Sequence, residues 1–186
     1  MGLMFRSRWI AVSAVAACVA VPAISSAQSE DLSLGPSVGL FFPMDEKLRD
    51  ALGSSWFSIG LGGVKTGEYR ERQLGFNYNI ISKSQSGNKV FILAGSYGLV
   101  QPLAGADAST RPYFAIRGGL AYMDYALDVD NDRLSGKKIG INANAELGII
   151  LSDRLTLAAR YDIFSAQDGL SFNGLSLSLK YGLVRF

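Results

Sequence analysis

From residue 32 to the last residue, apolar side chains alternate one for one with polar or small ones in eight successive stretches. The stretch "QLGFNYNI", for example, places Leu, Phe, Tyr and Ile at every second position, with Gln, Gly and Asn between them. Because neighbouring side chains of a β-strand point to opposite faces, a period of two predicts strands with one apolar face. The stretches are 32–41, 56–63, 73–80, 90–100, 111–123, 139–149, 155–163 and 174–186.

Strands of this length and number predict a closed sheet. Several stretches have 10 to 13 residues, whereas a typical strand has about 5–6. An open sheet would expose two edges, and closure into a barrel removes them. We therefore expect an all-β fold, an eight-stranded antiparallel up-and-down β-barrel.

Alternation alone does not determine which face of the barrel points outwards. The polar face is rich in Gly, Ser and Asn and has few of the Lys and Glu residues of a solvated surface. Small side chains fit the narrow interior of an eight-stranded barrel, which favours a transmembrane barrel with its apolar face towards lipid. A secreted, lipocalin-like barrel that binds a ligand is the soluble alternative. Aromatic residues suited to membrane interfaces lie near strand ends, namely Phe42, Phe57, Tyr78, Tyr97, Phe114, Tyr122, Tyr161 and Tyr181.

The first residues have the pattern of a signal peptide. Two arginines precede the apolar segment 9–21, and small residues follow at the positions that a signal peptidase recognises. We expect cleavage after Ala27, so that residues 1–27 are the signal peptide and residues 28–186 form the barrel domain. A lipoprotein signal is the alternative, since "VAAC" ends at Cys18. If cleavage follows Ala27, the mature chain has no cysteine and no disulfide.

Charge and composition exclude several classes of function. Outside residues 1–27 the chain has sixteen basic and sixteen acidic residues, so its net charge does not suggest a nucleic-acid partner. The chain has no histidine, the usual general base beside a serine nucleophile and the main zinc ligand. We therefore expect no enzymatic activity, no cofactor and no metal.

One acidic segment resembles the beginning of a calcium-binding loop. Asp128, Asp130 and Asp132 occupy the first three ligand positions. However, Arg133 stands where such a loop needs glycine, and Ile139 stands where it needs glutamate. This segment is better interpreted as a solvated acidic loop.

Five charged residues form the strongest constellation on the polar face. They lie at similar depths on four consecutive strands, so we expect a salt-bridged plug across the middle of the barrel. Buried charges need partners. The plug is either structural packing, which the filled interior of such a barrel favours, or the gate of a low-conductance pore. The cluster consists of Arg117, Glu146, Arg160, Asp162 and Lys180.

The segments between the strands are expected to be turns at one end of the barrel and longer loops at the other. "MDEKLRDALG", in the first loop, has helical spacing and predicts a short surface helix. The expected loops are 43–55, 82–89, 126–137 and 165–171.

The signal, the eight alternating strands and the terminal Phe186 resemble the small outer-membrane β-barrel proteins typified by the transmembrane domain of OmpA and by OmpX. In that family the outer-membrane assembly machinery reads an aromatic residue at the end of the last strand. "YGLVRF" is similar to that signal, although the alternation changes phase between Leu183 and Val184. A β-bulge there, or departure of the last residues from the strand, would explain the change.

The resemblance implies a location and partners. It implies a cell outer-membrane protein, exported through a cleaved signal peptide, that contacts outer-membrane lipid and lipopolysaccharide as a monomer. The expected role is non-enzymatic, in envelope structure or in surface interactions through the loops.

Overall fold

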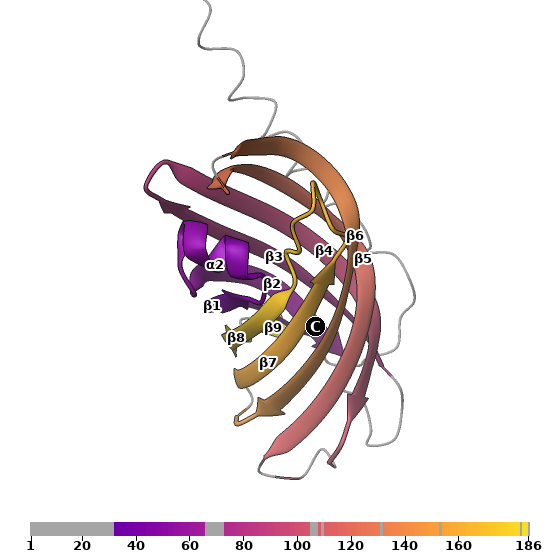
Figure 1. Ribbon diagram of the computed structural model, residues 1–186. Coiled ribbons are helices and arrows are strands. Elements are labelled where there is room, and N and C mark those ends of the chain that lie inside the picture. The colour runs from indigo at the N-terminus through magenta and orange to yellow at the C-terminus, as the bar shows by residue number, and fades with distance from the viewer. Residues whose placement is uncertain are drawn as a thin grey trace, which may run out of the picture.

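The computed structural model shows a closed, strongly tilted sheet with one short helix at its mouth (Figure 1). The structure describes residues 32–65, 73–104, 108, 110–130, 132–152, 154–182 and 184–185. The expected signal peptide with its cleavage residue Ala27, as well as Cys18 and Phe186, lies outside these residues. Among the described residues, no helix is both long and apolar enough to span a membrane.

Each strand from β1 to β7 pairs antiparallel with the next strand in the chain, and β1 pairs with both β2 and β8 to close the sheet. A short segment, β9, continues β8 along β1. The predicted eight-stranded antiparallel up-and-down barrel is confirmed. The elements are β1 (Leu32–Pro43), α2 (Glu46–Leu52), β2 (Trp56–Lys65), β3 (Gln73–Gln85), β4 (Asn88–Pro102), β5 (Arg111–Val129), β6 (Asp132–Ile150), β7 (Leu155–Phe164), β8 (Gly174–Tyr181) and β9 (Val184–Arg185).

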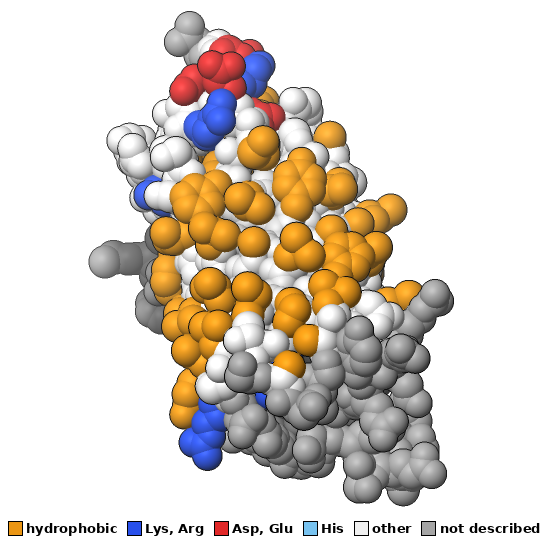
Figure 2. Space-filling model, turned by 90° about the horizontal axis from the view of Figure 1, so that it is seen from below, with side chains coloured by type: hydrophobic (Ala, Val, Ile, Leu, Met, Phe, Trp, Pro, Cys, Tyr) orange, Lys and Arg blue, Asp and Glu red, His pale blue; other side chains and the backbone are white. Residues whose placement is uncertain are grey.

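The apolar face of the strands points outwards. Large apolar side chains remain exposed on every strand from β1 to β8 and so form a belt around the barrel. Figure 2 shows the part of this belt that lies on one side of the molecule. Leu120 is 63% exposed and Ile141 is 67% exposed, although both lie in the middle of long, fully paired stretches of backbone. The soluble alternative requires these residues inside the barrel, whereas the structure places them on its outer surface.

The C-terminal strand contains a β-bulge, as the change of phase in its apolar–polar alternation predicts. Ser37 pairs with Lys180, whereas Leu34 pairs with Val184. Between these two pairs β1 advances by three residues and the C-terminal strand by four. One extra residue therefore lies between Lys180 and Val184, and it shifts the alternation by one position.

The two ends of the barrel differ. The turn end carries the β2–β3, β4–β5 and β6–β7 connections, and the loop end carries α2 and the remaining connections. At the loop end, the expected loop 126–137 is largely strand, because β5 and β6 pair continuously up to Val129 and Asp132. The expected loop 82–89 is also shorter, since β3 and β4 meet in a tight turn in which Ser86 and Gly87 have positive φ.

The inward residues of β5 show how the interior is layered. From the turn end, Tyr113 and Ala115 belong to a small apolar cluster, Arg117 follows, and the residues from Ala121 to Val129 belong to a large apolar cluster at the loop end. On β5, the inward face is therefore polar only in the middle of the barrel and apolar towards both ends. From other elements, the loop-end cluster contains Phe41, Trp56, Ile81, Ile92, Phe164, Leu170 and Phe172.

The predicted helix is present, but its apolar side is buried rather than at the surface. Asp45 caps its N-terminus by accepting a hydrogen bond from the backbone N–H of Leu48 at 3.3 Å, and Gly53 ends it with φ of 81°. Leu48 and Leu52, one turn apart, are fully buried in the loop-end cluster. The helix therefore closes the mouth of the barrel.

A charge placed on the apolar belt tests whether lipid surrounds it. We expect Leu120→Arg to lower the free energy of unfolding by about 2–4 kcal/mol in lipid vesicles, because the guanidinium would lie in hydrocarbon. Ala126→Arg is the matched control, since it lies on the same face of β5 but beyond the belt, opposite Lys89 and Ser135. Urea titration of both variants in vesicles measures the difference, and equal stability of the two would contradict a membrane-spanning belt.

Candidate functional site

The five charged residues of the interior charge cluster (Arg117, Glu146, Arg160, Asp162 and Lys180) all face the inside of the barrel. Four of them are at most 3% exposed, and the side chain of Lys180 is 14% exposed. Strand register brings them together, because Glu146 pairs directly with Arg160, and Asp162 lies in the same row as Asn144 and Arg117. Directly paired residues share one face of a sheet.

Glu146 is the centre of the first of two networks. Its Oε1 accepts a hydrogen bond from Lys180 Nζ at 2.6 Å, one from the Tyr113 hydroxyl at 2.7 Å and a longer one from Arg117 Nη2 at 3.4 Å. Arg117 Nη1 lies 3.4 Å from Glu146 Oε2. One buried carboxylate thus faces two cations from two other strands.

Tyr113 belongs to this network, although the charge pattern of the sequence did not indicate it. Its ring lies against Gly148, where a Cβ would overlap the ring atoms. The glycine lets the ring cross β6, so that the hydroxyl reaches Glu146. The available signal was the parity of Tyr113, which shares the inward face of β5 with Arg117.

Arg160 and Asp162 form the second network. Arg160 Nε donates to Asp162 Oδ2 at 2.9 Å, and the Ser176 hydroxyl donates to the same oxygen at 3.0 Å. Asn79 also faces the Arg160 guanidinium, which its amide oxygen contacts when the amide is oriented to accept. The Arg160–Asp162 pair therefore has no net charge, and both side chains have further hydrogen-bond partners.

The arrangement of these groups suits cohesion across the barrel. The two networks join β3 and β5–β8 through the interior, and apolar clusters lie towards both ends. The cluster includes no cysteine or histidine. In the described part of the chain, no three His, Cys, Asp or Glu side chains are grouped so as to hold a metal ion.

Solved structures with the same fold are outer-membrane proteins. The outer-membrane enzyme PagL superposes with a TM-score of 0.62 at 14% identity, covering 80% of this chain and 99% of PagL. Ail, the attachment invasion locus protein of Yersinia pestis, has a TM-score of 0.55 at 13% identity over 84% of this chain and 97% of Ail. Neisserial surface protein A has a TM-score of 0.50 at 10% identity over 86% of this chain and 100% of its own.

The fold is that of the small outer-membrane β-barrels. In sequence, no protein-family model matches the chain, and comparison with curated proteins finds no relative. At these identities the likeness concerns the fold alone, so function has to be argued from this chain's own residues.

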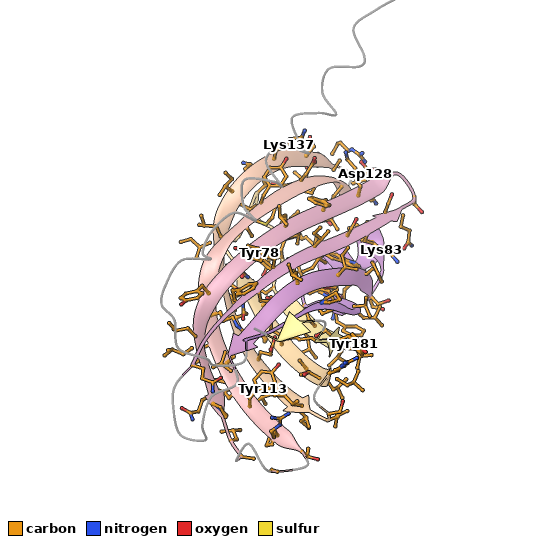
Figure 3. The ribbon with its side chains drawn as sticks, turned by 180° about the vertical axis from the view of Figure 1, so that it is seen from behind. Tyr78, Lys83, Tyr113, Asp128, Lys137 and Tyr181 are labelled. Atoms are coloured by element: carbon orange, nitrogen blue, oxygen red, sulfur yellow. The ribbon has the colours of Figure 1, made fainter. Side chains whose placement is uncertain are left out.

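At the loop end, hydrogen bonds and ion pairs connect the separate connections into one cap. Asp45 Oδ2 accepts a hydrogen bond from the backbone N–H of Ser171 at 2.9 Å, which joins the first and last loops. Asn88 donates to the carbonyl of Ala51 at 3.1 Å and accepts from the N–H of Asp128 at 2.8 Å. Figure 3 shows Lys83, Asp128 and Lys137 at this end and Tyr113 towards the other.

The acidic segment at the tip of β5 and β6 has cationic partners. Lys47 Nζ lies 2.6 Å from Asp130 Oδ2, and Arg133 Nη1 lies 2.7 Å from Asp128 Oδ2. These carboxylates hold the tip to α2 and to the opposite strand.

The last loop is attached through Asp168, a residue with positive φ. Its carboxylate accepts hydrogen bonds from the Tyr125 hydroxyl and, at 3.1 Å, from Lys138 Nζ. These donors, Tyr125 first, hold the pKa of the Asp168 carboxyl below its ordinary value of 3.8.

Removing the charge of Glu146 tests the first network. Glu146→Gln would leave Arg117 and Lys180 buried without their anion, so we expect the free energy of unfolding to fall by about 3–5 kcal/mol. Chemical unfolding in detergent measures it. Asp130→Asn breaks an exposed pair and should leave stability nearly unchanged. Equal effects of the two substitutions would contradict a cohesive role for Glu146.

Titration of Asp168 tests the attachment of the last loop. The pKa of Asp168 is lower in the folded state than in the unfolded state. The contact therefore stabilises the folded loop fully when the pH is above the unfolded-state pKa. This stabilisation is lost as the pH falls through the folded-state pKa. We expect NMR titration to give a pKa below 3.8 for Asp168. Tyr125→Phe should raise this pKa, and an unchanged value in the variant would show that the hydroxyl does not hold the carboxylate.

Proposed function

We propose that this protein is an integral protein of the bacterial outer membrane with a non-enzymatic role, in envelope structure or in surface interactions through its loop end. The observation that carries the proposal is the belt of exposed apolar side chains around a closed barrel (Figure 2). Exposed apolar surface of this extent marks contact with lipid or with other proteins, and a belt that surrounds a closed barrel fits lipid. A barrel with no open strand edge is one of the two structures that satisfy their backbone in hydrocarbon.

A structural role is supported by the filled interior. The interior charge cluster crosses the middle of the barrel, and the loop-end apolar cluster and α2 occupy the space towards the loops. An eight-stranded barrel has room only for packed side chains. The charges therefore serve cohesion.

A role in surface interactions is supported by the cap at the loop end. Its connections are held to one another by Asp45, Asn88 and Asp168, so the cap presents a preformed surface. Ail, whose fold is similar, is named the attachment invasion locus protein, and we extend only the surface-interaction role that this name suggests to the present chain.

Location and partners belong to the same proposal. Export through residues 1–27 with cleavage after Ala27, and assembly through the terminal residue Phe186, would deliver the barrel to the outer membrane. There it would lie as a monomer among lipid and lipopolysaccharide, with no nucleic-acid partner. The closer resemblance to OmpA and OmpX stays a prediction, as does the absence of enzymatic activity in a chain without histidine.

A low-conductance pore gated by the interior charge cluster is the second candidate. It is favoured by one specific observation, the unpartnered polar atoms buried around Arg117 and Glu146. Such atoms indicate that water enters the polar layer.

Two measurements test the main proposal. The folded protein should fractionate with outer membranes, and its gel mobility should change on boiling, because a closed barrel resists detergent until it is heated. Recovery in the soluble periplasmic fraction, with no change of mobility, would contradict it.

Conductance in planar bilayers separates the two candidates. For a structural plug, we expect no channel activity from the wild-type protein, and none from Arg117→Ala or Glu146→Ala when they fold. Channels that open in either variant, or that open in the wild-type protein, would favour the gated pore.

A further inference from the structure

Seven buried polar atoms in the middle of the barrel have no hydrogen-bond partner. They belong to five side chains on β3, β5 and β6. Buried polar groups in folded proteins are almost always partnered, by protein, ordered water or a ligand. The atoms are both amide atoms of Gln73, Asn77 Nδ2, Arg117 Nε and Nη1, Asn144 Oδ1 and Glu146 Oε2. Two of them, Arg117 Nη1 and Glu146 Oε2, are 3.4 Å apart and form an ion pair with each other, which leaves five atoms without a partner.

Strand register brings the donors among these atoms together. Arg117 pairs with Gly98, which in turn pairs with Gly75. Two glycines in this row let the Arg117 side chain extend towards β3, where Nε comes within 3.9 Å of the Cβ position of Gly75. Gln73 and Asn77 flank Gly75 on the same inward face of β3. Gln73 and Asn77 therefore lie on either side of the position that Arg117 Nε reaches.

The charges around this position do not balance. The interior charge cluster has three cations and two anions. Arg160 and Asp162 neutralise each other, which leaves Glu146 alone against Arg117 and Lys180. An uncompensated charge in a buried site is strongly unfavourable, so this part of the barrel is short of one negative charge.

We propose that the barrel holds a single small monovalent anion, chloride, between Arg117, Gln73 and Asn77. Arg117 Nε, Gln73 Nε2 and Asn77 Nδ2 are its donors. Water bound beside the ion supplies donors to two unpartnered acceptors, which are the side-chain oxygens of Gln73 and Asn144. The ion is monatomic, because apolar side chains occupy the interior on both sides of the polar layer.

Water alone would satisfy the same hydrogen bonds but would leave the excess charge in place. A cation would increase that excess, and Glu146 is already engaged by Lys180 and Tyr113. The site goes beyond the proposed function, since it concerns neither transport nor the loop-end surface.

Bromide in place of chloride gives a direct test. Crystals of the refolded full barrel grown in sodium bromide should show an anomalous peak inside the barrel, within about 3.5 Å of donor atoms of Arg117, Gln73 and Asn77. If bromide peaks lie on the outer surface only, the result is an adventitious ion only, and it would overturn the proposal. Water density in the interior without an anomalous peak would also overturn it.

A stability measurement tests the same site in solution. When chloride replaces gluconate at constant ionic strength, we expect the midpoint of heat unfolding to rise, because the ion binds the folded state only. Gln73→Leu should abolish this rise. The variant should still fold, since it removes an amide with no partner.

Gln101→Leu is the matched control, because Gln101 lies on the neighbouring strand β4 near the same end and its amide is already bonded to Pro102. It should keep the full chloride-dependent rise. A rise of the same size in Gln73→Leu, or no rise in the wild-type protein, would show that the polar layer holds water and no anion.

Discussion

The structure depends on the pairing of β1 with β8, which turns a sheet with two edges into a barrel with none. In hydrocarbon an unpaired strand edge would leave a row of backbone donors and acceptors unsatisfied, each at a cost of several kcal/mol. Closure removes that cost and also divides the side chains into two sets. One set faces outwards, and the other must fill a narrow interior.

The interior is filled by different kinds of side chain at three levels along the barrel axis. Apolar side chains fill both ends, whereas the middle contains ion pairs from four strands around Glu146 and Asp162, with one cation in excess. Such a layer contributes little net stability over apolar packing, but loss of one member is costly. The same layer is also where the proposed anion compensates the charge that the protein leaves unbalanced.

Much of this could be predicted from residue spacing. Strand periodicity placed the eight strands, and parity together with depth brought the five charged residues to one layer. The change of phase before Val184 predicted the extra residue that the register shows. Tyr113 was harder to recognise, because its part in the network requires Gly148 opposite its ring, and that contact joins different strands. The sequence also did not predict the full length of the β5–β6 hairpin. The polar residues near its tip indicated a loop, whereas the two strands stay hydrogen-bonded up to Val129 and Asp132.

By itself, the sequence determined that the chain forms long strands with two unlike faces, since a period of two is a local property of neighbouring residues. The composition of the two faces favoured the apolar face outside, but only the tertiary structure decided it, because either face can line a barrel until the sheet curves in one direction. It also decided that the apolar side of α2 is buried and that Glu146, rather than Asp162, meets two cations. Those outcomes depend on which distant strands lie side by side, and local alternation carries no information about such contacts.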